Sequence, residues 1–117
     1  MTIEEMKNVA DTPVILAEQD GFITFINKAF ESAYGWAAND LVGKPLTTII
    51  AKKMHDSHQL GFSRFLTTGK ATILNQKLKL MMVTKDGKEL ETEHFIVAEK
   101  QNGRWVFGGT IVVPPKN

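Results

Sequence analysis

A histidine in the middle of an apolar helical stripe is the feature of this sequence that most clearly suggests chemistry. Read as a helix at about 100° per residue, the segment from Met54 to Gly69 divides into an apolar and a polar face. The apolar face carries Met54, His55, His58, Phe62, Phe65 and Leu66. Because a buried polar group without a partner costs about 1–3 kcal/mol, His58 requires a hydrogen-bond partner, a metal or a cofactor.

Two interpretations of His58 are open at this point. Its neutral imidazole can ligate a metal through one ring nitrogen. It can also be a core histidine bonded to the backbone or to Gln76, which falls in the inward, otherwise apolar set of a predicted strand.

For His55, at the edge of the stripe, we expect a partly exposed structural role. Asp56 points away from both histidines at helical spacing, which disfavours a metal ion bound by the three. His94 falls on a strand, and nothing further marks it.

Composition narrows the class of protein. The chain has 117 residues, enough for one domain, and its 14 basic and 13 acidic residues nearly cancel. No long-range field therefore favours nucleic acid, and no apolar stretch is long enough to cross a membrane. We expect a cytoplasmic protein. Neither an elbow serine nor paired carboxylates accompany the histidines, so we expect no enzyme.

Turn signals divide the chain into helices and strands. A capping box at Thr2 and Glu5 predicts an N-terminal cap helix within residues 1–12, and we expect residues 114–117 to form a loose tail. Hairpin dipeptides separate β-rich segments between residues 13 and 113. The predicted strands are Val14–Ala17, Phe22–Ile26, Thr72–Val83, Glu89–Ala98 and Arg104–Val113. The order of elements predicts an α+β fold, a five-stranded antiparallel sheet with helices packed on one face.

This order of elements, together with several short motifs, resembles the PAS sensory domain. The matching segments are Phe25-Ile26-Asn27-Lys28-Ala29-Phe30, Tyr34-Gly35-Trp36, Asp40-Leu41-Val42-Gly43-Lys44-Pro45-Leu46, Thr68-Gly69, Lys85-Asp86-Gly87 and Gly108-Gly109-Thr110-Ile111. The resemblance implies sensing or protein–protein interaction. It also implies a cavity between the long helix and the inner sheet face, where members of the family bind flavin, haem or small metabolites.

The long helix is similar to that of haem-binding PAS domains from oxygen-sensing kinases and phosphodiesterases. The shared pattern is His58-x5-Arg64-x4-Gly69. The resemblance implies a b-type haem, with His58 as proximal iron ligand and Arg64 near a propionate. Leu78 stands where those proteins carry a distal arginine, which would suit carbon monoxide, nitric oxide or a second protein ligand better than oxygen. The expected cofactor-binding residues are His58, Arg64, Phe62, Met54, Phe65, Leu78 and Gln76.

The expected partners follow from the same resemblance and from the apolar strip of the N-terminal cap helix. Ile3, Met6 and Val9 give the cap helix a narrow apolar strip, and family members often pair through this helix, so we expect a homodimer. The signalling partner would act in trans or be fused in a longer chain. Without cysteine the chain can form no covalent flavin adduct. The alternative is a ligand-free PAS module that serves dimerisation or protein interaction.

Overall fold

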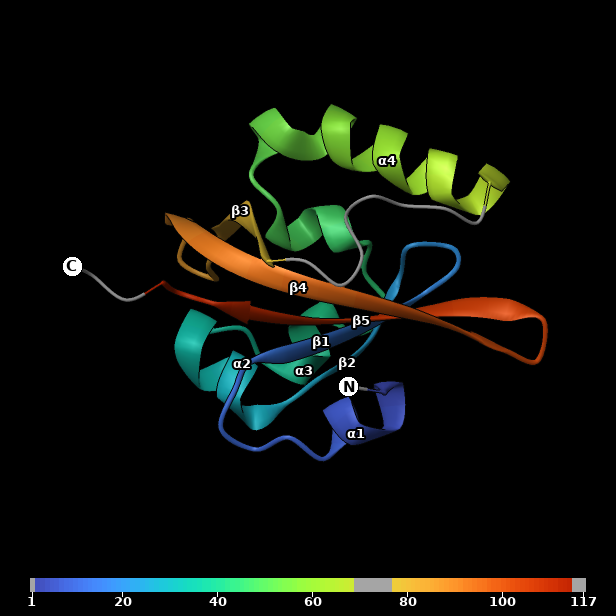
Figure 1. Ribbon diagram of the computed structural model, residues 1–117. Helices are drawn as coiled ribbons and strands as arrows, with labels where there is room; N and C mark the ends of the chain where they lie inside the picture. Colours follow the sequence, from blue (N-terminus) through green and yellow to red (C-terminus); the bar gives the residue numbers. More distant parts are fainter. Residues whose placement is uncertain (1, 69–76, 115–117) are drawn as a thin grey trace.

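A twisted antiparallel sheet forms the centre of the computed structural model, which describes residues 2–68 and 77–114 (Figure 1). Its strands follow the spatial order β2-β1-β5-β4-β3. Their bounds are β1 Val14–Glu18, β2 Ile23–Ile26, β3 Lys77–Val83, β4 Glu89–Gln101 and β5 Arg104–Val112. The predicted fold class is confirmed. The first part of the predicted strand Thr72–Val83 lies outside the described residues.

Three tight turns set the register of this sheet, as the hairpin dipeptides predicted. Gly21 and Gly87 have φ of 83° and 90°, values that a side chain would disfavour. Asn102 and Gly103 both have positive φ, 53° and 79°, as a two-residue hairpin turn requires. The turn at Asn102 lets β4 and β5 pair from Gln101↔Arg104 to Glu93↔Val112. Therefore β4 continues three residues beyond its predicted end.

Helices α2, α3 and α4 lie on one face of the sheet, as predicted, and the N-terminal cap helix α1 lies on the other. The bounds are α1 Ile3–Lys7, α2 Lys28–Tyr34, α3 Ala38–Leu41 and α4 His55–Thr68, with 3₁₀ turns at Leu46–Ile49 and Lys52–Met54. One core cluster joins Phe30 and Tyr34 of α2 to Ile15, Leu80 and Ile111 of the sheet. We call this side of the sheet the inner face. Helix α4 covers another part of the inner face, and α1 packs on the opposite, outer face (Figure 1).

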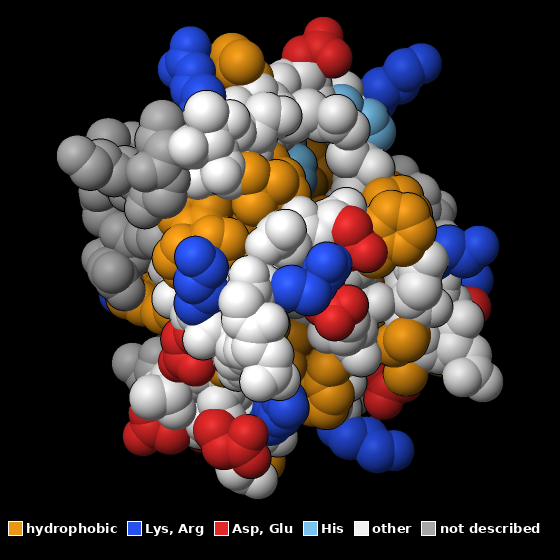
Figure 2. Space-filling view, turned by 90° about the vertical axis from the view of Figure 1, so that its right-hand side faces the viewer, with side chains coloured by type: hydrophobic (Ala, Val, Ile, Leu, Met, Phe, Trp, Pro, Cys, Tyr) orange, Lys and Arg blue, Asp and Glu red, His pale blue; other side chains and the backbone are white. Residues whose placement is uncertain are grey.

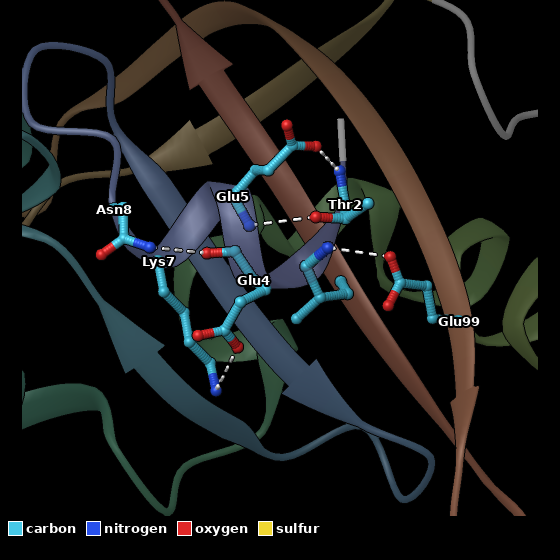
Figure 3. A network of polar contacts seen from close by, with 7 residues as sticks. Thr2, Glu4, Glu5, Lys7, Asn8 and Glu99 are labelled. Atoms are coloured by element: carbon cyan, nitrogen blue, oxygen red, sulfur yellow. Dashed lines mark hydrogen bonds and ion pairs between the residues drawn. The ribbon is translucent and has the colours of Figure 1, made fainter.

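The cap helix α1 is held at its start by the predicted capping box. Thr2 Oγ1 accepts from the amide of Glu5, and the Glu5 carboxylate accepts from the amide of Thr2 (Figure 3). The amide of Ile3 donates to Glu99 Oε2 of β4 at 2.9 Å. Ile3 and Met6 are each 1% exposed and pack on Val14 and Leu16 of the outer face. The apolar strip of α1 is thus buried within its own chain.

Asn27 fastens the segment after α1 to the start of α2. Its side-chain oxygen accepts from the amides of Val14 and Phe30, and the second of these bonds caps α2. Its amide nitrogen donates to the carbonyls of Val9 and Thr12. Asn27 is buried, and both polar atoms of its side chain form hydrogen bonds. This one side chain therefore links the segment after α1 to the first residue of β1 and to the start of α2.

Candidate ligand-binding cavity

A cavity of about 400 Å³ lies between α4 and the inner face of the sheet. Its walls are largely apolar; they include Ile15, Leu80, Ile96, Phe107 and Ile111. Figure 2 shows a hollow whose walls are mostly hydrophobic side chains, with histidine atoms among them. Ligand pockets in proteins typically measure about 300–1,000 Å³ and combine apolar walls with a few polar groups. The hollow is therefore within the range of sizes and the type of lining that small-molecule sites have.

The α4 wall of the cavity consists mainly of aromatic side chains. The rings of His58 and Phe62 stack with centroids 6.1 Å apart and an interplanar angle of 25°. Phe62 contacts Phe107 of β5 at 5.1 Å, and Phe65 contacts the same ring at 5.2 Å and Trp105 at 4.8 Å. These contacts attach α4 to the sheet at its aromatic stripe, so His58 is held in the wall by its neighbours.

Two imidazoles stand among the polar groups of the cavity, whose lining also includes Ser57 and Lys79. His58 comes from α4, and His94 comes from β4 on the facing wall. Neither side chain has a hydrogen-bond partner within the described part of the chain, although both are more than half-buried. Burial lowers the pKa of His58, and the nearby charge of His55 lowers it further. Burial likewise lowers the pKa of His94, with a further contribution from His58. Both imidazoles are therefore held neutral near pH 7, with a lone pair available to a ligand.

His94 lines the cavity but was not among the predicted site residues. Successive side chains of a strand alternate between faces, and on β4 Phe95 and Val97 face the outer side with α1. His94 and Ile96 therefore face the cavity. The register places His94 beside Leu78 on one side and Ile111 on the other. The alternation was readable in the sequence, but the cavity opposite this position was not.

The structure brings together some of the predicted cofactor-binding residues. Met54, His58, Phe62, Phe65 and Leu78 all line the cavity. Met54 Sδ also accepts from the amide of Met81 at 3.3 Å. The cavity wall thus contains four residues of the predicted helix stripe, together with Leu78.

Other predicted residues lie elsewhere. Arg64 is on the exposed side of α4 and does not line the cavity, and Gln76 lies outside the described residues. Leu66, assigned to the apolar face, is 39% exposed, because the stripe that meets the sheet centres on His58, Phe62 and Phe65. His55 Nε2 lies 2.7 Å from the carbonyl oxygen of Ile50, the partly buried structural place that we expected for it.

A second hollow, of about 190 Å³, adjoins the α4 side of the cavity. It lies between α4 and the β1–β2 turn and is lined by Asp20, Gly21, Phe22, Pro45, Leu46, Thr47, His58, Gln59, Phe62 and Ser63. His58, Phe62 and Leu46 belong to both hollows. These three side chains therefore separate the cavity from the second hollow.

Two kinds of feature are absent from the described residues. Within residues 2–68 and 77–114, no group of three or more histidine, cysteine, aspartate or glutamate residues could hold a metal ion. None of the helices in that part of the chain is long and apolar enough to cross a membrane.

Comparisons with known proteins agree with this architecture. The PAS domain family profile matches residues 11–113. An uncharacterized protein of Azorhizobium caulinodans is 30% identical over 99 residues, which are 84% of this chain and 14% of the relative. The PAS domain of a Desulfitobacterium hafniense protein superposes with a TM-score of 0.72 at 16% identity, covering 94% of this chain and 99% of that one. A light-oxygen-voltage domain studied with a flavin analogue gives a TM-score of 0.72 at 13% identity, covering 97% and 84%. The chain belongs to the PAS domain family.

Proposed function

We propose that this PAS domain is a sensory module that binds a small ligand or cofactor in the cavity beneath α4, with b-type haem, ligated by His58, as the leading candidate. The observation that carries the proposal is an apolar cavity of about 400 Å³ with an imidazole in its wall that lacks a hydrogen-bond partner among the described residues. No buried side-chain nitrogen or oxygen among the described residues lacks a partner, so the free ring nitrogens of His58 are open to the cavity. A ligand in the cavity would meet them there.

The residues of the cavity fit a planar, largely apolar cofactor. His58 is held neutral by burial, which is the form of imidazole that ligates metals. Phe62, Phe65 and Phe107 offer ring surfaces, and Leu78 adds an apolar wall. Arg64, exposed on α4, could meet a propionate only at the rim. Bound haem would supply an iron that takes up a diatomic gas; the protein's part is to orient the cofactor and exclude water.

A ligand signals only if it binds two conformations with different affinity. The cavity touches β4 and β5 on their inner face, and α1 contacts the same strands from the outer face. A change in the cavity would therefore be transmitted through the strands to α1. The recipient is a signalling partner in trans or in a longer chain, since the Azorhizobium relative is about seven times as long as the matched part. Homodimerisation remains part of the proposal, but Ile3 and Met6 are already buried, so a dimer would use other residues of α1 and its surroundings.

The experiment is reconstitution with haem followed by gel filtration and a pyridine haemochrome assay. We expect about one haem per chain in the wild type and a loss of most of it in His58→Leu, which retains apolar bulk. His55→Leu is the matched control, because His55 contacts the backbone carbonyl of Ile50 and does not itself line the cavity, and it should retain haem. Arg64→Ala should weaken binding only modestly.

The competing interpretation is a ligand-free interaction module. It predicts no haem uptake by the wild type and a loss of stability in His58→Leu that is no larger than that of other cavity substitutions. Haem retained in full by His58→Leu would overturn the assignment of His58 as ligand.

A further inference from the structure

The second hollow and the cavity share a wall, and the geometry of α4 explains how. On a helix, residues four positions apart lie one above the other on the same face. His58 and Phe62 form one such row, and both line the cavity and the second hollow. Gln59 and Ser63 form the adjacent row, and they line the second hollow without lining the cavity. The second hollow therefore lies one row further around α4, beyond His58 and Phe62 as seen from the cavity.

The lining of the second hollow is more polar than that of the cavity. Asp20, Thr47, Gln59 and Ser63 all contribute to it, and all of these except Thr47 are exposed to solvent. The cavity walls, by contrast, are largely apolar. The surroundings thus change from a polar, solvent-facing lining to an apolar interior across a single layer of side chains.

We propose that the second hollow is the entrance through which ligands reach the cavity, and that the ring of Phe62 moves to open it. This inference rests on the proposed function, because it assumes a ligand inside the cavity. It concerns the path of that ligand, and it applies to haem and to any other small apolar molecule that the cavity admits.

Phe62 is the part of the shared wall that has room to move. A Cβ at Gly21 of the β1–β2 turn would lie 3.9 Å from Phe62 Cζ, so the tip of the ring borders a residue that has no side chain. Phe62 is only partly buried, and rotation toward the turn would exchange its contact with Phe107 for a place in the second hollow. Leu46, in the same wall, instead packs against the core cluster of the inner face. Opening therefore requires a side-chain rotation and no unfolding of α4.

A different path would run between α4 and β3. Ser57 and Lys79 line the cavity there, and both are exposed. If ligands entered on that side, an obstruction in the second hollow would leave the rate of binding unchanged. The two paths are thus distinguished by the rates of entry and exit.

The test obstructs the second hollow reversibly. Because the chain contains no cysteine, Ser63→Cys introduces a single thiol into the lining. Benzyl methanethiosulfonate then attaches a bulky group through a disulfide that a reductant removes. Leu60→Cys is the matched control, because Leu60 lies on the same helix, is 55% exposed and lines neither hollow.

Stopped-flow measurements follow the binding of two probes, haem and the apolar fluorescent dye N-phenyl-1-naphthylamine. Labelled Ser63→Cys should bind and release both probes at least tenfold more slowly, with a Kd within twofold of the unlabelled protein. An obstructed path slows entry and exit alike and leaves the bound state unchanged. Reduction should restore both rates, and labelled Leu60→Cys should show no change. Phe62→Leu, which shortens the moving side chain, should bind the dye at least fivefold faster. Ile96→Trp, which fills the cavity, should abolish dye binding.

The outcomes separate this proposal from the proposed function. Association rates that do not respond to the label on Ser63→Cys overturn the entrance. Faster release with unchanged association also overturns it, because the second hollow would then be part of the bound ligand's site. An unchanged association rate in Phe62→Leu overturns the role of Phe62. Failure of the wild type to take up haem overturns the haem assignment, while the dye still tests the entrance, and binding of neither probe overturns both proposals.

Discussion

Gly108 provides the sharpest test of how α1 docks on the sheet. A Cβ at this position would lie 2.6 Å from Met6 Sδ, 2.8 Å from Ile3 Cδ1 and 2.9 Å from Leu16 Cδ2. Real Cβ atoms do not approach so closely, so in Gly108→Ala the side chains of Met6, Ile3 and Leu16 must shift, which changes how α1 packs on the sheet. The backbone itself is not the obstacle, because the φ of Gly108 is not positive.

The expected cost follows from two opposing contributions. Overpacking a well-packed site costs about 1–3 kcal/mol, while replacing a strand glycine by alanine recovers about 0.5–1 kcal/mol. The midpoints of these ranges predict a net loss of about 1.2 kcal/mol in the free energy of unfolding, and the extremes span about 0–2.5 kcal/mol. Complete undocking would instead forfeit the burial of Ile3 and Met6, about 1.5–3 kcal/mol each, so local adjustment is the cheaper response.

The neighbouring glycine supplies a matched control. A Cβ at Gly109 would meet nothing closer than the carbonyl oxygen of Phe95 at 3.5 Å, so Gly109→Ala should be neutral or slightly stabilising. Urea denaturation of both variants measures the difference, and amide exchange reports the fraying of α1. Met6→Ala combined with Gly108→Ala should cost less than the sum of the two single changes. Equal stability of the two alanine variants, with α1 protected alike, would refute this description of the interface.

Further predictions concern other parts of the fold. Asn27→Asp keeps the oxygen that accepts from Val14 and Phe30 but replaces the nitrogen that donates to Val9 and Thr12 with a second acceptor oxygen. Denaturation should show a loss of about 1–3 kcal/mol in the free energy of unfolding, and an unchanged midpoint would contradict this. Tyr34 is the only tyrosine of the chain, and burial raises its pKa to about 12. Absorbance at 295 nm should therefore show no tyrosinate until well above pH 10 in the folded protein. Because the unfolded chain releases this proton near pH 10, stability should fall between pH 10 and 12, and Tyr34→Phe should lack that contribution. Blue light should produce no long-lived absorbance change, since no cysteine can form a flavin adduct; such a change would disprove the expectation. Light scattering should show a homodimer, and a monomer at high concentration would remove that proposal.

Local signals made much of the fold predictable. Asp-Gly and Asn-Gly dipeptides mark the turns, because positive φ values are required there. The capping box of Thr2 and Glu5 likewise depends on four consecutive residues and forms as predicted. Features set by contacts distant in sequence were harder to predict. No local pattern shows that α1 would bury its strip on the outer face against Leu16.

The candidate site was predictable in the same partial way. Helical periodicity placed His58 and Phe62 on the stripe that meets the sheet. The stripe is narrower than the pattern suggested, because the sheet reaches Phe65 but leaves Leu66 at the surface. His94 was missed because its meaning depends on which sheet face lies opposite α4, and that relation exists only in the folded chain.

The most direct test of the cavity's role is a spectrophotometric titration of haem into the purified chain. We predict a Soret band that rises linearly and breaks at one haem per chain in the wild type, with no such break in His58→Leu. A titration without a break in the wild type, or the same break in both proteins, would contradict the account of the cavity as a site built around His58.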